Sequence, residues 1–485
     1  MELELDTSRD TSVNGLAVHD EAVLTPEERR AEKWFVLKID FIILPLIAII
    51  YFLAALDRSD VGNAAVAGMT DDLKLTPGEL SNCVAFIFIG LMLMQLPGAL
   101  LVRLLTPPIQ LGCALIAWGT ATTLICEAQN WQTIAGLRVV VGLFEAFIQG
   151  APLYLTLWYK QHELATRGAI FASMQSVAGS MNGLIAYAIQ NTMDGRLGRP
   201  AWRWLFLIEG VVSVGAGVVM VFVLPPAPEN IKRGFTKAER EIALRRTKEA
   251  YNVPHTTIHL KQLLAVLKDK KILFYCLLNG CTSISSTAWS QFLPVILHNA
   301  GYTQTETQVL TIPVYVVSGV VTIAIGYLSD RFHMRGSPLI ASYLIAVAGW
   351  IMLLATRDMR TAYAGTFLIG MGSQTTVILQ LAWLNSNVIG YTKKGGSLAI
   401  ANIFGQLCAL ASSFSFRDGP DYFTGKGLSL AATGVGAILT AVFMLYLGRL
   451  NMVKLANKDT VNAAEQRKRG VEDLCDAHPD FMYSL

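Results

Sequence analysis

Long runs of apolar residues alternate with short polar segments along nearly all of this 485-residue chain. About twelve of these runs reach the roughly 20 residues that an α-helix needs to cross the hydrocarbon core of a bilayer. The pattern therefore predicts an all-α polytopic membrane protein with twelve transmembrane helices. Their expected positions are 39–60, 80–102, 109–127, 131–153, 166–189, 202–224, 271–297, 307–329, 337–356, 361–386, 396–416 and 428–449.

The longest polar segment between these runs, Pro225 to Lys270, divides the predicted helices into two groups of six. It is rich in Lys and Arg, as are the shorter loops near Lys160, Arg331 and Lys393, and such loops are retained in the cytoplasm. With twelve spans, both termini are then expected in the cytoplasm. The predicted organisation is a cytoplasmic tail (1–35), a six-helix half (36–224), a cytoplasmic linker (225–270), a second six-helix half (271–450) and a cytoplasmic tail (451–485).

Composition supports a membrane protein and excludes several other classes. Charged residues make up 15% of the chain, against about 25% in a soluble domain. The net charge of +3 is too small to indicate a nucleic-acid partner. The seven cysteines form no Cys-x-x-Cys pair, so neither a metal site nor a disulfide framework is expected. We expect no cofactor, and with no ATP-binding module visible, any transport must be driven by gradients.

Two pairs of ionisable residues interrupt the apolar runs of the first half. Arg138 and Glu145 are seven residues apart, about two helical turns, so they share one helix face. Asp57 and Arg58 end the first run and point about 100° apart. A charge at bilayer depth costs about 2.5–3.5 kcal/mol on insertion scales, so paired charges suggest a working site. For Arg138 and Glu145, the alternative is a static pair that holds this helix to its neighbours. For Asp57 and Arg58, the alternative is a helix end at the membrane interface.

The chemistry of these side chains fits anion and proton binding. A guanidinium offers a planar fork of donors that matches a carboxylate in two-point contact, which a lysine cannot reproduce. The proton affinity of Glu145 depends on how close Arg138 lies, so a movement of Arg138 would couple proton binding to a change of state.

A faint internal repeat relates the halves, since Gly98 to Arg103 aligns with Gly326 to Arg331. Parallel six-helix halves with a midplane site are common in secondary transporters. The segment from Gly326 to Gly336 reads Gly-Tyr-Leu-Ser-Asp-Arg-Phe-His-Met-Arg-Gly and resembles the loop signature of the major facilitator superfamily. The resemblance implies a cytoplasmic gating motif. Its residues are Gly326, Asp330, Arg331 and Arg335. The alternative is a short loop that merely follows the positive-inside rule.

Further segments resemble the anion:cation symporter family, and within it fungal carriers of the allantoate permease type. They are 57–64, Arg138 to Glu145 to Pro152, 202–210, 383–387 with 390–394, and 416–422. The chain departs from the family where Val102 replaces an acidic residue in the first-half loop and where Asp60 replaces a frequent Asn.

This resemblance implies that Arg58 binds the substrate carboxylate and that Asp57 and Glu145 carry protons, with Arg138 as the switching partner of Glu145 in the substrate site. Three polar residues are further candidates for contacts to the substrate body, although such residues also bridge helices. They are Gln175, Asn385 and Asn387.

These observations predict a carrier that moves a small organic anion, such as a vitamin or an allantoate-like nutrient, together with protons. The expected setting is a fungal plasma membrane, with the bilayer, protons and substrate as partners of a monomer. The alternatives are a proton-coupled exporter and a non-transporting nutrient sensor. Such exporters usually resemble one another through a Gly-Pro motif in the fifth helix, and the absence of proline from 171–189 argues against the exporter. An enzyme is not expected, because the sequence shows no pairing of a nucleophile with a base.

Overall fold

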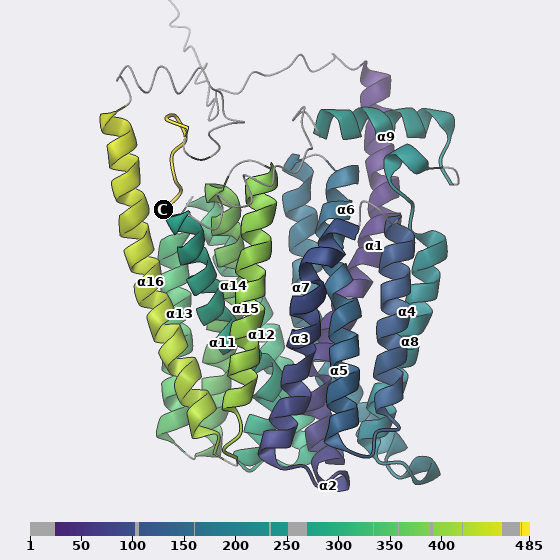
Figure 1. Ribbon diagram of the computed structural model, residues 1–485, viewed down its shortest axis with the longest axis vertical. Helices are drawn as coiled ribbons and strands as arrows, with labels where there is room; N and C mark the ends of the chain where they lie inside the picture. The colour runs from purple at the N-terminus through teal and green to yellow at the C-terminus, as the bar shows by residue number, and fades with distance from the viewer. Residues whose placement is uncertain are drawn as a thin grey trace, which may run out of the picture.

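The computed structural model describes residues 25–101, 106–159, 161–231, 234–250, 269–332, 334–356, 358–388, 391–419, 421–457, 476 and 478–485. All regular secondary structure in these ranges is helical. Twelve long helices form two groups of six that lie side by side in Figure 1, so the predicted fold class is confirmed.

The first group begins with α1 and ends with α8. Its long helices are α1 (Pro26–Ala64), α3 (Pro77–Leu101), α4 (Pro107–Ile125), α5 (Trp131–Glu145), α7 (Gln161–Met193) and α8 (Ala201–Val223). The second group comprises α11 (Lys270–Asn299), α12 (Gln304–Arg331), α13 (Gly336–Ala355), α14 (Met359–Asn387), α15 (Tyr391–Ser415) and α16 (Phe423–Ala456). Short helical segments complete the described chain: η1 (Ala65–Met69), α2 (Thr70–Asp72), η2 (Ala146–Gly150), α6 (Ala151–Trp158), η3 (Arg196–Gly198), η4 (Pro228–Asn230) and α9 (Lys237–Ala250).

Ten of the described helices are long and apolar enough to cross a membrane. Helices α7 and α11, with 33 and 30 residues, are also long enough, but they carry polar residues such as Asn182 and Asn279 that lower their hydropathy. Large apolar side chains are exposed on the outward faces of both groups, for example Phe222 and Leu445. Exposed apolar surface on this scale is expected where a protein faces lipid.

Side-chain caps determine where several of these helices begin. Thr25 and Glu28 form a reciprocal capping box at the start of α1, and Thr303 and Glu306 form another at the start of α12. Asn130 accepts a hydrogen bond from the backbone N–H of Thr133 at the start of α5. Each cap satisfies backbone N–H groups that the first helical turn leaves without partners.

The two halves pack tightly where the end of α1 meets the end of α11. A Cβ atom on Gly62 would lie 2.2 Å from the backbone oxygen of Gln291, so glycine alone fits there without a shift. Close by, the Gln308 amide donates to the backbone oxygen of Asn63 at 3.2 Å. These contacts join α1 of the first half to α11 and α12 of the second.

Other contacts close the same end of the molecule. The Arg417 guanidinium donates to the Asn82 side chain at 3.0 Å, and the Gln190 amide donates to Gln304 at 2.9 Å. This closed end, which carries α2, is opposite the end where α9 and the C-terminal residues lie (Figure 1). We refer to these as the closed end and the α9 end.

Candidate functional site

The four charged residues predicted from the sequence form two ion pairs between α1 and α5. Arg138 Nη1 donates to Asp57 Oδ2 at 2.8 Å and to the Asp57 backbone oxygen at 2.9 Å. Arg58 pairs with Glu145. Arg138 and Glu145 are therefore not a static pair in this state, and the expected role of Arg138 as the switching partner of Glu145 stays a prediction. Both residues lie on one face of α5, but each reaches across to α1 and not along its own helix.

The two pairs differ in their access to solvent. The side chains of Arg138 and Asp57 are only 1% and 4% exposed, and Thr122 also donates to Asp57 at 2.8 Å. Glu145 is fully buried, whereas the Arg58 side chain is 30% exposed. Arg58 is thus the member of this group that an incoming anion can reach. An unpaired buried charge is costly, so in each pair the two opposite charges stabilise each other.

Sequence reasoning missed two further acids beside these pairs. Asp60, one helical turn after Asp57 on α1, is completely buried, and Glu209 on α8 is 5% exposed. Their carboxyl groups lie close enough to interact directly. The Asn182 amide on α7 donates to Asp60 Oδ1 at 2.8 Å. The available signal was the charge itself, because an acid within an apolar run is a functional candidate by default.

The predicted substrate-contacting amides lie on α7 and α14 and differ in exposure. Gln175 and Asn385 have exposed side chains. Asn387 is buried at the end of α14, where its side-chain amide donates to the backbone oxygen of Ser484 at 3.0 Å and its oxygen accepts from the Ser484 backbone N–H at 2.7 Å. In this state the Asn387 side chain therefore forms hydrogen bonds with the C-terminal residues.

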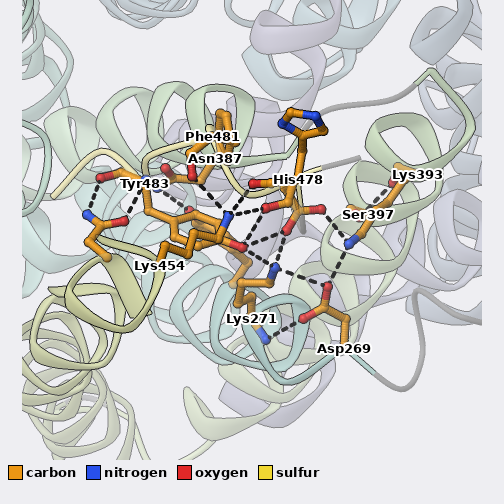
Figure 2. A network of polar contacts seen from close by, with 12 residues as sticks. Asp269, Lys271, Asn387, Lys393, Ser397, Lys454, His478, Phe481 and Tyr483 are labelled. Atoms are coloured by element: carbon orange, nitrogen blue, oxygen red, sulfur yellow. Dashed lines mark hydrogen bonds and ion pairs between the residues drawn. The ribbon is translucent and has the colours of Figure 1, made fainter. Parts of the chain in front are cut away.

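These C-terminal residues, 476 and 478–485, lie at the α9 end, where the C-terminus is marked in Figure 1, and we call them the C-terminal latch. Figure 2 shows their polar contacts with the second half. The fully buried Asp476 carboxylate pairs with Lys271 of α11 and with Lys393 of α15, the latter at 2.5 Å. Lys454 of α16 donates to three backbone oxygens of the latch. Burial alone would raise the pKa of Asp476, but the two lysines outweigh burial and hold that pKa below its usual value.

The predicted gating motif lies at the end of α12 and is linked to the latch. Asp330 pairs with Arg335 at 2.5 Å, and the backbone N–H of Arg335 donates to the backbone oxygen of Leu485 at 2.9 Å. Arg331 is exposed, and Gly326 has open space around the position of a Cβ. The matching first-half positions, 102 and 103, lie outside the described residues.

A narrow cavity lies between the halves just beyond the ion pairs, with room for roughly one water molecule. It is lined by Ser59, Asn63, Gly179, Ser290, Pro294, Thr311 and Tyr315. These residues come from α1, α7, α11 and α12, so the cavity lies where helices of the two halves meet. Within the described ranges, no three His, Cys, Asp or Glu side chains are grouped to hold a metal ion.

Comparisons with known proteins agree with this architecture. A sequence profile of the Major Facilitator Superfamily matches residues 47–415, and the chain belongs to this superfamily. It is a secondary transporter of the bilayer, not an enzyme, with multiple membrane spans.

Similar proteins are also named as transporters. One is an uncharacterised transporter of Schizosaccharomyces pombe, 31% identical over 96% of this chain and 94% of the relative. Another is the high-affinity nicotinic acid transporter of Saccharomyces cerevisiae, 27% identical over 99% of this chain and 89% of the relative. The crystal structure of a D-xylose-proton symporter superposes with a TM-score of 0.65 at 13% identity, covering 82% of this chain and 97% of that one. At this identity, the structural match establishes the fold alone.

Proposed function

We propose that this transporter is a proton-coupled symporter of a small organic anion, and that it belongs to the anion:cation symporter family in its allantoate permease branch. The observation that carries the proposal is the pair between partly exposed Arg58 and fully buried Glu145. The Arg58 guanidinium, which can bind an anion, is accessible to solvent, whereas the Glu145 carboxylate that competes for it is not.

Competition for Arg58 provides the coupling. While Glu145 is ionised, its carboxylate occupies the Arg58 guanidinium. A proton on Glu145 removes that competition, so Arg58 can take a substrate carboxylate in two-point contact. Anion and proton are then bound together and released together. This order has an energetic benefit, because an interior-negative potential opposes anion entry by about 2.3 kcal/mol per charge per 100 mV.

The distribution of basic residues supports an orientation for this cycle. Lysines and arginines gather at the α9 end of the second half: Lys270, Lys271, Arg331, Arg335, Lys393, Lys394 and Lys454. By the positive-inside rule, the α9 end lies in the cytoplasm, and both termini with it. The closed end then faces outward, as expected for a carrier that has delivered its substrate. We assign this cycle to a monomer in the plasma membrane.

Nicotinate is the first substrate to test, because the relative in Saccharomyces cerevisiae is named a nicotinic acid transporter. Purified protein in proteoliposomes is expected to accumulate radiolabelled nicotinate, or another carboxylate of a panel, when an inward pH gradient is imposed. Glu145→Gln should abolish this accumulation and retain exchange of substrate across the membrane, because glutamine carries no transferable proton.

Glu127→Gln is the matched control, since Glu127 is 62% exposed and pairs with Arg199 at the closed end. Its accumulation should equal that of the wild type. Preserved accumulation in Glu145→Gln would remove Glu145 from the proton path. Binding of a carboxylate without any flux would identify a sensor and refute the symport proposal.

A further inference from the structure

Six ionisable side chains meet between α1, α5 and α8, and their charges do not balance. They are Asp57, Arg58, Asp60, Arg138, Glu145 and Glu209. Two arginines neutralise two acids through the ion pairs described above. Asp60 and Glu209 remain, and neither is in an ion pair with a described Lys or Arg. Two ionised carboxylates would leave two uncompensated negative charges in the interior.

The hydrogen bonds around this carboxyl pair are also incomplete. Asp60 Oδ1 accepts from Asn182, but Asp60 Oδ2 and both carboxyl oxygens of Glu209 receive no N–H or O–H of the described residues. Buried polar atoms are rarely left without a partner. A proton shared between the two carboxyl groups reduces this deficit from three oxygens to one, because it turns one oxygen into a donor to another.

We propose that Asp60 and Glu209 form a proton-binding pair that holds at least one proton in this state. Two acids in contact cannot both ionise readily, so the pair binds a proton on one side chain and shares it with the other. The neutral Asn182 amide from α7 fixes the orientation of Asp60 and supplies no charge. The only bond that changes on loading or release is one carboxyl O–H, and the proton passes to or from water.

The surroundings connect this pair to the ion pairs. Asp57 lies one turn earlier on α1, and the Arg138 guanidinium of α5 acts electrostatically on both Asp60 and Glu209. Movement of Arg138 away from the pair would strengthen proton binding there, and its approach would favour release. The pair therefore deepens the proposed symport by adding a second proton site, and this role in transport rests on the proposed function.

Infrared difference spectroscopy tests the pair without any substrate. Purified wild-type protein at neutral pH is expected to show the C=O stretch of a protonated, buried carboxyl group that persists as the pH is raised past neutrality. Glu209→Gln and Asp60→Asn should each shift or remove this band, because each leaves one carboxyl with an amide neighbour. Glu127→Gln, which changes an exposed acid, should leave the band unchanged.

Identical bands in the wild type and in both folded variants would overturn the proposal. Each variant keeps the volume of the side chain that it replaces. A melting temperature in detergent close to that of the wild type identifies the variants that fold, and using two guards against one that does not. A second readout is the number of protons moved per nicotinate, taken from the reversal potential in proteoliposomes. We expect Glu209→Gln to lower this number by one; an unchanged number would exclude the pair from coupling. If nicotinate is not transported, the infrared result still decides whether the pair holds a proton.

Discussion

At the scale of single residues, the arrangement depends on what an arginine offers that a lysine does not. Arg58 pairs with buried Glu145 and is still 30% exposed, so its planar fork can serve the acid and a ligand in turn. A lysine places a single point charge on a flexible stem and makes no two-point contact with a carboxylate.

Arg58→Lys is therefore expected to weaken binding of the transported carboxylate at least tenfold, equivalent to about 1.4 kcal/mol. Isothermal titration calorimetry with the purified variant measures this change. Arg199→Lys is a suitable control, because Arg199 pairs with exposed Glu127 at the protein surface. Affinity close to that of the wild type in Arg58→Lys would refute the two-point clamp.

The sequence indicated which charges matter but not how they pair. Spacing along α5 placed Arg138 and Glu145 on one face, and the structure agrees with that placement. Their partners were not predictable, because spacing within one helix carries no information on the neighbouring helix that the face meets. Asp60 and Glu209 each carried the signal of an acid within an apolar run, but the approach of one to the other, which joins α1 to α8 across 149 positions of the chain, was not predictable either.

At the scale of elements, the closed end depends on the tight fit of α1 against α11. Gly62 meets the backbone of Gln291, and backbone atoms cannot move aside as a flexible side chain does. A methyl group at this position must separate the two helices.

Gly62→Ala is expected to open the closed end and shift the carrier away from the state described here. In a background without native cysteines, a cysteine at Asn82 should react faster with a membrane-impermeant maleimide when Gly62→Ala is present. Gly215→Ala provides the control, because a Cβ on Gly215 of α8 meets no other atom within 4 Å. Equal labelling rates in the two variants would show that this contact does not determine the state.

The C-terminal latch is a second element-level feature, and its ion pairs give it a defined pH dependence. The pKa of Asp476 is held below its usual 3.8, so docking stabilises the protein above that value and is lost as the pH falls through the lowered pKa. Hydrogen exchange of residues 478–485, corrected for intrinsic rates, should show protection from neutral pH down to about pH 4 and loss below it.

Asp476→Asn should remove this protection at neutral pH as well, because the buried side chain loses its charge opposite Lys271 and Lys393. Asp480→Asn is the matched control within the latch, since Asp480 is exposed. Protection that persists in Asp476→Asn would mean that the backbone hydrogen bonds to Lys454 and Asn387 hold the latch by themselves.

Prediction of elements succeeded where a local pattern determines the structure. The twelve apolar runs became twelve long helices because helix length and hydropathy are properties of contiguous residues. The latch has no such signature. Its docking depends on Asp476 meeting lysines about 80 and 200 positions earlier in the chain. The latch also bonds to the Asn387 side chain in this state, and the substrate contact expected for Asn387 stays a prediction.

At the scale of the whole molecule, the halves share a fold but differ in chemistry. The first half buries charged side chains in its helices, whereas the second half buries hydroxyl and amide groups that bond to one another. Examples in the second half are Ser285 with Ser373 at 2.7 Å and Thr282 with Gln380 at 2.8 Å. The side chains of the proposed proton and anion chemistry therefore lie in the first half, and the second half offers a neutral polar surface opposite them.

Alternating access requires that the closed end open in each cycle, and this can be tested by linking the halves there. A Cβ on Gly419, just after α15, would lie 3.1 Å from the Cβ of Pro77 at the start of α3, near the separation of about 3.5–4.5 Å found in disulfides. The double variant Pro77→Cys with Gly419→Cys is expected to crosslink under mild oxidation and to lose transport. A reductant should restore it, and each single variant should transport before and after oxidation. Full transport by the crosslinked protein would show that this end stays closed throughout the cycle, and the carrier would then need another route to the outside.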